Sequence, residues 1–158
     1  MSLFNLLSVS ASGMAAQRRR AEVLVENLAN AETTRTPEGG PYRRKDVIFE
    51  SAAAEGPFSA VFASQLRGTP GNGQTPGNRQ TMEGVRIAEV VQDQREPEKR
   101  YQPGHPDADK EGYVSYPHLN PAEEMVDLMS ASRGYQSNVA AMAAAKEMIQ
   151  KTLDIMRG

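Results

Sequence analysis

Apolar residues repeat with a helical period at both ends of this 158-residue chain, and this pattern restricts the fold more than any other feature. Near the start, every third or fourth position gives the set Leu3, Leu7, Ser10, Met14, Gln17, Ala21, Leu24, Leu28 and Ala31. Near the end, the same spacing gives Met125, Leu128, Ser132, Tyr135, Val139, Met142, Lys146, Ile149, Leu153 and Met156. We call these sets the N-terminal stripe and the C-terminal stripe. Each is typical of a long helix that packs along a partner helix.

The C-terminal helix has a clear beginning. Asn120 is a favoured N-cap residue, and Pro121 suits the first helical position because the N–H it lacks would be unpaired there. No proline follows, so the helix is expected to continue almost to residue 158. Alanines such as Ala131, Ala140 and Ala144 lie around it and permit close packing on more than one face. A simpler alternative is an intramolecular helical hairpin that assembles into nothing larger.

The segment between the stripes has a different pattern. Residues 46–49 are β-prone, residues 85–91 alternate as in a half-buried strand, and Tyr113–Ser115 form a short third run. We therefore predict a mainly α fold with a small β region. Long N- and C-terminal helices form a coiled-coil-like pair in it, beside a small central β-rich domain. The expected divisions are an N-terminal helix at 1–34, a β-rich region at 35–119 with a flexible loop near 66–81, and a C-terminal helix at 120–158.

Composition and motifs argue against several functional classes. The chain has 18 basic and 20 acidic residues, and its basic residues are mostly scattered, so no nucleic-acid partner is expected. It has no cysteine, which excludes a disulfide framework and a thiolate metal site. The sequence contains no G-x-S-x-G turn, P-loop or G-x-G-x-x-G motif. We therefore expect no enzyme, no cofactor and no small-molecule substrate.

One acidic stretch resembles half of a calcium-binding loop. Asp107, Asp109, Glu111 and Gly112 match its first positions, but His118 stands where a bidentate glutamate is needed. An exposed acidic turn with Gly112 at positive φ is the favoured interpretation, and no metal is expected. A metal-dependent binding module is the remoter alternative.

Features of a targeting segment are weak. The first apolar stretch is interrupted by Asn5 and Ser8 and has no leading basic cluster, so we expect no cleaved signal peptide. The apolar runs are also much shorter than the roughly 20 residues that a membrane helix needs. A protein of this kind that leaves the cytoplasm would require a dedicated exporter.

Two groups of residues resemble a known family. Asn27-Leu28-Ala29-Asn30, followed by Thr33 and then Pro41-Tyr42-Arg43, resembles the N-terminal signature of the flagellar rod and hook family. The longer form Thr36–Tyr42 is similar to that of its proximal-rod members. So is a C-terminal group comprising Gly112-Tyr113-Val114, Pro117, Glu124-Met125-Val126, Met129, Ala131-Ser132-Arg133 and Tyr135-Gln136-Ser137-Asn138. The resemblance covers about 1–50 and 84–158 and leaves 51–83 without a counterpart, as an insert whose role is open.

This resemblance implies a structural subunit of the proximal rod of the bacterial flagellar basal body. Such a subunit assembles through its terminal helices into the helical drive shaft that transmits motor torque. The implied partners are copies of itself, other proximal and distal rod subunits, an adaptor at the rod base or membrane ring, and the flagellar type III export apparatus. The implied location is the periplasmic rod, reached without signal cleavage. The alternative is a cytoplasmic helical adaptor or export chaperone of a type III secretion system.

The candidate functional residues are those of an assembly interface. We expect Asn27, Asn30 and Asn138 to act as polar anchors that set the register between helices, as a buried asparagine does in a coiled coil. The remaining interface residues come from the two stripes: Leu3, Leu7, Met14, Ala21, Leu24, Leu28, Met125, Leu128, Tyr135, Val139, Met142, Ile149, Leu153 and Met156.

Overall fold

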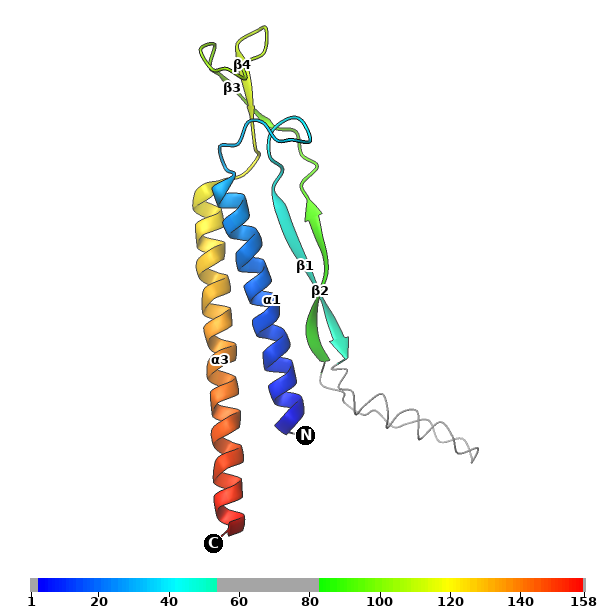
Figure 1. The fold of residues 1–158 in the computed structure, drawn as a ribbon, viewed down its shortest axis with the longest axis vertical. Coiled ribbons are helices and arrows are strands. Elements are labelled where there is room, and N and C mark those ends of the chain that lie inside the picture. Colours follow the sequence, from blue (N-terminus) through cyan, green and yellow to red (C-terminus); the bar gives the residue numbers. More distant parts are fainter. Residues whose placement is uncertain (1–2, 54–82, 158) are drawn as a thin grey trace, which may run out of the picture.

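The structure is a computed structural model, and it describes residues 3–53 and 83–157. Its elements are α1 (Leu3–Ala29), β1 (Lys45–Ala53), β2 (Glu83–Gln92), β3 (Glu98–Tyr101), β4 (Tyr113–Tyr116) and α3 (Pro121–Arg157) (Figure 1). The prediction of a mainly α fold with long terminal helices and a small β region is confirmed. The loop expected near 66–81 lies outside the described residues.

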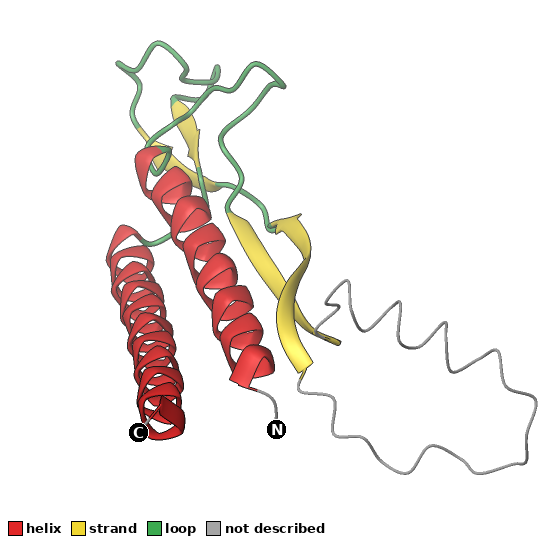
Figure 2. Cartoon of the chain, turned by 60° about the horizontal axis from the view of Figure 1, so that its bottom comes forward, coloured by secondary structure: helices red, strands yellow, loops and turns green. Residues whose placement is uncertain are grey.

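The two helices lie side by side and run in opposite directions, with β1 and β2 on the other side of α1 (Figures 1 and 2). Helix α1 is therefore the middle layer of three. Among the described residues, α3 packs against α1 and has no contact with β1 or β2. One long side of α3 rests on α1, while the rest of its circumference faces away from the molecule.

In the part of the β region that the structure describes, the strands form two antiparallel two-stranded sheets. Strands β1 and β2 pair from Lys45 opposite Gln92 to Ala53 opposite Glu83, with a register shift between Ile48 and Phe49. This shift has the character of a β-bulge, which increases the local twist of the ribbon. The sheet is attached to α1 by apolar contact and by a hydrogen bond from the Val85 amide to the Ser12 hydroxyl (3.1 Å).

Strands β3 and β4 form a small hairpin above the helices (Figure 1). The acidic stretch predicted to be an exposed turn connects them. Gly112 has φ of 85°, as expected, and a Cβ there would lie 2.9 Å from the Tyr101 ring. The Asp109 carboxylate accepts hydrogen bonds from the backbone N–H of Glu111 and Tyr113, both at 2.9 Å. The carboxylate thus stabilises the turn itself.

The apolar core is small and centred on α1. Its buried apolar residues are Ala16, Val23, Leu24, Tyr42, Val47, Val114, Ala131 and Ala145. Most of these side chains are small, so the helices approach closely but remove little apolar area from water. Within the described residues, neither helix is long and apolar enough to cross a membrane.

Candidate assembly site

The C-terminal stripe divides into a part that packs within the chain and a part that does not. Leu128, Met142 and Ile149 are half-buried beside α1. Val139 and Leu153 are 43% and 50% exposed, and the other exposed apolar members of the stripe are Met125, Tyr135 and Met156. The face that rests on α1 is instead formed by the set Glu124, Ala131, Asn138 and Ala145, at intervals of seven. The face of α3 that contacts α1 is therefore displaced by one residue around the helix axis from the C-terminal stripe.

The N-terminal stripe is also only partly covered. Leu24 is buried, whereas Leu7, Met14, Ala21 and Leu28 are half-buried. Leu3 lies within α1, but its side chain is outside the described residues. Sequence reasoning missed a second buried face of α1, formed by Ala16 and Val23. These two residues are also seven apart, and that spacing was the signal for a second packing partner, which is the β1–β2 sheet.

Two glycines let the helices approach each other. A Cβ at Gly13 would lie 3.0 Å from the side-chain amide of Asn138, and one at Gly134 would lie 3.1 Å from Cδ of Gln17. Each helix thus offers a glycine to an amide side chain of the other. Asn138 also donates a hydrogen bond to the Gly134 carbonyl (2.9 Å). Its amide lies against α1 of the same chain, where a shift of either helix would bring side chains into collision.

Asn27 is the centre of a buried polar network at the end of the helix pair. Its side chain is fully buried. The Nδ2 group donates to the Lys45 carbonyl (2.8 Å) and to Glu124 Oε2 (3.0 Å). The Oδ1 atom accepts from the Lys45 amide (2.9 Å) and from the Tyr42 hydroxyl (3.0 Å). Both donors and both lone pairs of the amide are therefore used, which is the condition for burying it at low cost.

Glu124 connects this network to α3 and to the Arg44 guanidinium. Its side chain is 2% exposed, and the Arg44 guanidinium forms an ion pair with its second carboxylate oxygen. Lys45 adds an outer ion pair with Glu26 and lies 5.8 Å from the centre of the Tyr42 ring. Burying a charged side chain is costly unless it is paired and hydrogen-bonded in this way. The network thus joins α1, the start of β1 and the first turn of α3.

The family signature residues build the chain reversal that makes this network possible. Asn30 donates to the Glu26 carbonyl (2.9 Å) and accepts from the Thr33 hydroxyl (3.1 Å) at the end of α1. The Tyr42 amide then donates to the Thr33 carbonyl (3.1 Å), which aims the Tyr42 ring back toward Asn27. The contacts of Asn27 and Asn30 in the structure are therefore within the chain, between its own elements.

Burial raises the pKa of Tyr42 to about 12, and the negative charges of Glu26 and Glu124 add to the shift. An unfolded tyrosine titrates near 10, so the unfolded state loses its proton first as pH rises. We expect stability to be fully present below about pH 10 and to fall between about pH 10 and 12. Chemical denaturation across this range should show a steeper loss for the wild type than for Tyr42→Phe, which starts about 1 kcal/mol less stable. Tyr101→Phe, at an exposed site, is the control. Parallel pH profiles for the wild type and Tyr42→Phe would contradict this assignment.

A groove runs between the helices on the side of α1 away from the sheet. It has a volume of about 700 Å³. Its floor includes Ala21 and Ala131, its apolar walls are Val25, Leu128 and Tyr135, and its remaining lining residues are Gln17, Arg18, Glu22 and Ser132. Both stripes contribute residues to it, so the two predicted apolar patterns converge on one surface. The Gln17 side-chain oxygen is buried without a hydrogen-bond partner in the described part of the chain.

Two family models match the segments that form this arrangement. The model described as flagella basal body rod protein matches residues 7–35, and the one described as flagellar basal body rod FlgEFG protein C-terminal matches residues 110–155. The first range holds most of α1 and the reversal after it. The second holds β4 and nearly all of α3.

Curated relatives match along almost the whole chain. The flagellar basal-body rod protein FlgC of Borreliella burgdorferi is 39% identical over 166 aligned residues, with 100% of each chain covered. FlgC of Bacillus subtilis is 43% identical over 159, covering 98% of this chain and 99% of its own. FlgC of Salmonella typhimurium is 37% identical over 155, covering 98% of each. These matches extend on both sides of residues 51–83, and the role of that segment stays open.

Proposed function

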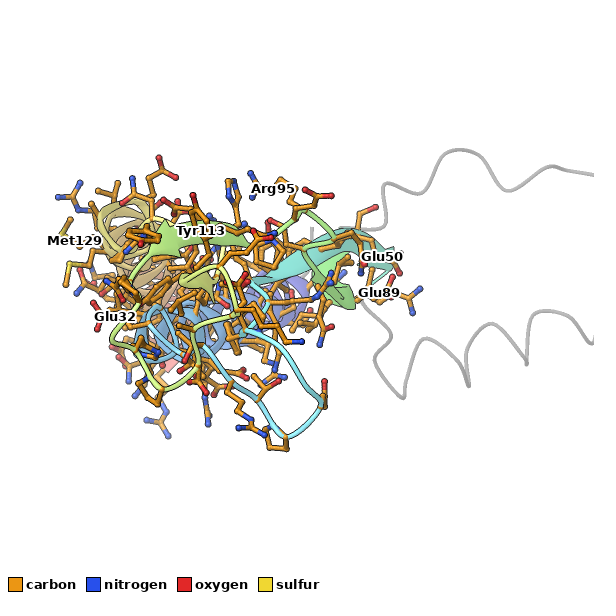
Figure 3. The ribbon with its side chains drawn as sticks, turned by 90° about the horizontal axis from the view of Figure 1, so that it is seen from above. Glu32, Glu50, Glu89, Arg95, Tyr113 and Met129 are labelled. Atoms are coloured by element: carbon orange, nitrogen blue, oxygen red, sulfur yellow. The ribbon has the colours of Figure 1, made fainter. Side chains whose placement is uncertain are left out.

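This chain belongs to the FlgC family of flagellar basal-body rod proteins and is a structural subunit of that rod, and we propose that it builds the proximal section through both terminal helices. One observation carries the proposal. The large apolar side chains of α3 are mostly outside the core of the single chain, among them Met125, Val126, Met129, Tyr135 and Val139. Figure 3 shows Met129 on the outer side of α3, remote from the sheet residues Glu50 and Glu89.

The energetics favour covering these side chains. Each large apolar residue contributes about 1.5–3 kcal/mol when it is fully removed from water. A continuous exposed set on one long helix marks an interaction surface. The interface members that the chain leaves open are Met125, Tyr135, Val139, Leu153 and Met156. Asn27 and Asn30 fix the chain reversal after α1 and thereby hold the helices in the arrangement that exposes these interface residues.

The partners follow from this role. The subunit contacts copies of itself and other rod proteins, including those of the proximal and distal rod. At its base it meets an adaptor of the membrane ring, and it reaches the periplasm through the flagellar type III export apparatus without cleavage of a signal peptide. Its task is to transmit torque through many apolar contacts in parallel, without catalysis, cofactor or metal.

Cryo-electron microscopy of isolated basal bodies from the source cell tests this function. We expect density for α1 and α3 of this chain as packed helices within the rod, directly above the membrane ring. Mass spectrometry of the same particles should detect the intact N-terminal region. A protein that stays in the cytoplasm and is missing from purified basal bodies would contradict the proposal and favour the adaptor or export chaperone.

A further inference from the structure

The helix pair carries an apolar ridge on the side opposite to its groove. Met148 and Ile155 are seven residues apart on α3 and are 48% and 81% exposed. Ala141, a further seven residues before Met148, is exposed as well. At 3.6 residues per turn, Met148 and Ile155 lie roughly 140–180° around the axis of α3 from the groove residues Leu128 and Tyr135. A hollow and a projection thus face in opposite directions on one helix.

The ridge ends in a part of α3 that α1 does not reach, since Met148 is level with the beginning of α1 and Ile155 lies beyond it. Helix α3 has 37 residues and α1 has 27, and α3 continues past the N-terminal end of α1 (Figure 1). All residues from Gln150 to Arg157 are exposed. This end of the helix has exposed apolar residues and lacks a partner within the described chain.

We propose that Met148 and Ile155 of one copy of this chain lie in the groove between α1 and α3 of the next copy. This inference rests on the proposed function, because a rod needs repeated contacts between subunits. A projection on one side and a hollow on the other give a head-to-tail contact that parallel copies can repeat, instead of a closed two-fold dimer. The lengths agree. Met148 and Ile155 are about 10.5 Å apart along the helix, and the groove from Gln17 to Val25 is about 12 Å long.

Charges beside the ridge match charges beside the groove. Lys151 and Asp154 flank Ile155, and Arg18 and Glu22 line the groove. In the single chain Lys151 pairs with Glu147 and Arg18 with Glu22, but both are exposed pairs along one helix, which contribute little and can exchange partners. The neighbour's α3 runs antiparallel to α1 in a parallel arrangement of copies, so Lys151 meets Glu22 and Asp154 meets Arg18 in the same register. Lys151 and Asp154 are about 4.5 Å apart along their helix, and Arg18 and Glu22 about 6 Å along theirs. In this register Met148 lies level with Val25.

Contacts within the chain show that this pairing must be between copies. Gln17 lies against Gly134 and Asn27 against Glu124, so Val25 is level with about residue 126 of its own α3. Met148 is about 22 residues further along, a distance of about 33 Å. A disulfide requires Cα atoms within about 7 Å. A bridge between positions 25 and 148 therefore reports a contact between two chains.

The absence of cysteine from the sequence makes this test direct. Val25→Cys/Met148→Cys is expressed in cells that lack their own copy of the protein, basal bodies are isolated, and mild oxidant is added. We expect non-reducing gels to show a ladder of dimers, trimers and longer species that dithiothreitol removes. The matched control Val25→Cys/Ala141→Cys places the second thiol on the same ridge about 10 Å away and should give monomer.

Other outcomes would overturn the inference. The head-to-tail contact would be rejected if rods contained the double variant without cross-links. It would also be rejected if the control gave the same ladder, or if either single cysteine variant formed dimers. Presence of the double variant in these particles with no ladder rejects only the contact, whereas absence of the wild-type chain from wild-type basal bodies rejects the proposed function.

Exchange of a charge pair provides a second measurement that does not need cysteine. Arg18→Asp and Asp154→Arg should each lower the amount of subunit in basal bodies by about fivefold. The double variant should restore it. Failure of the double variant to restore incorporation, with all three proteins folded by circular dichroism, would also reject the contact.

Discussion

Replacement of Asn27 by leucine should lower the free energy of unfolding by about 3–5 kcal/mol. The amide is fully buried and makes four hydrogen bonds, to both backbone polar groups of Lys45, to Tyr42 and to Glu124. Leucine has a similar size but no polar group. The hydroxyl of Tyr42, the backbone of Lys45 and one oxygen of Glu124 would then be left without this partner in a site that excludes water. Such uncompensated groups account for the size of the loss.

Urea denaturation of the purified chain, followed by circular dichroism, measures this effect. Asn5→Leu is the matched control because it makes the same exchange at an exposed position of α1, where a change within about 0.5 kcal/mol is expected. A loss below about 1 kcal/mol for Asn27→Leu would contradict the network. Arg44→Met should also destabilise the chain strongly, since it removes the cation that pairs with the buried Glu124.

Val139→Asp is expected to abolish motility while leaving the isolated subunit as stable as the wild type. Val139 is 43% exposed in the single chain, so an aspartate there keeps its contact with water. In a packed rod the same carboxylate would lose its water without gaining a partner, at a cost of several kcal/mol for every subunit. The defect is therefore one of assembly.

Complementation of a strain that lacks the gene tests this prediction. Soft-agar swarming should be lost with Val139→Asp and retained with Val139→Ile, which keeps the side chain apolar. The aspartate variant should still be secreted, and its unfolding free energy should stay within about 0.5 kcal/mol of the wild type. Normal swimming by the aspartate variant would remove Val139 from the interface.

Local sequence signals predicted most of the secondary structure. The period of the apolar residues predicted both long helices, and the N-cap of α3 is confirmed by a hydrogen bond from the Ala122 amide to the Asn120 side chain (3.0 Å). The runs at 46–49, 85–91 and 113–115 lie in β1, β2 and β4. Strand β3 was missed because Glu98–Tyr101 is exposed at every position and shows no alternation. It is a strand because β4 supplies its hydrogen-bond partner.

Only part of the candidate assembly site could be predicted from the sequence. The two stripes were predicted as an assembly interface, and that prediction stands untested. Within the chain, the two helices meet through Gln17 of the N-terminal stripe and through Gly13, Ala131 and Asn138, which lie outside both stripes. Small residues and flat amides allow the closest approach of two backbones. The bulkier residue Val139 is displaced to the outside. Apolar periodicity shows that a face avoids water, without showing which partner covers it.

The amino-acid sequence by itself determined the elements of this protein and its family. The sequence signals were helical periods, caps, turn glycines and the signature around Asn27. Each depends on residues only a few positions apart, so each can be recognised in the sequence alone. Only the tertiary structure decided that Asn27, Lys45 and Glu124 share one buried network and that the groove and the ridge face opposite ways. These relations join residues about 20 to 100 positions apart, and they depend on the rotation of each helix about its axis, which is set by packing against its neighbours.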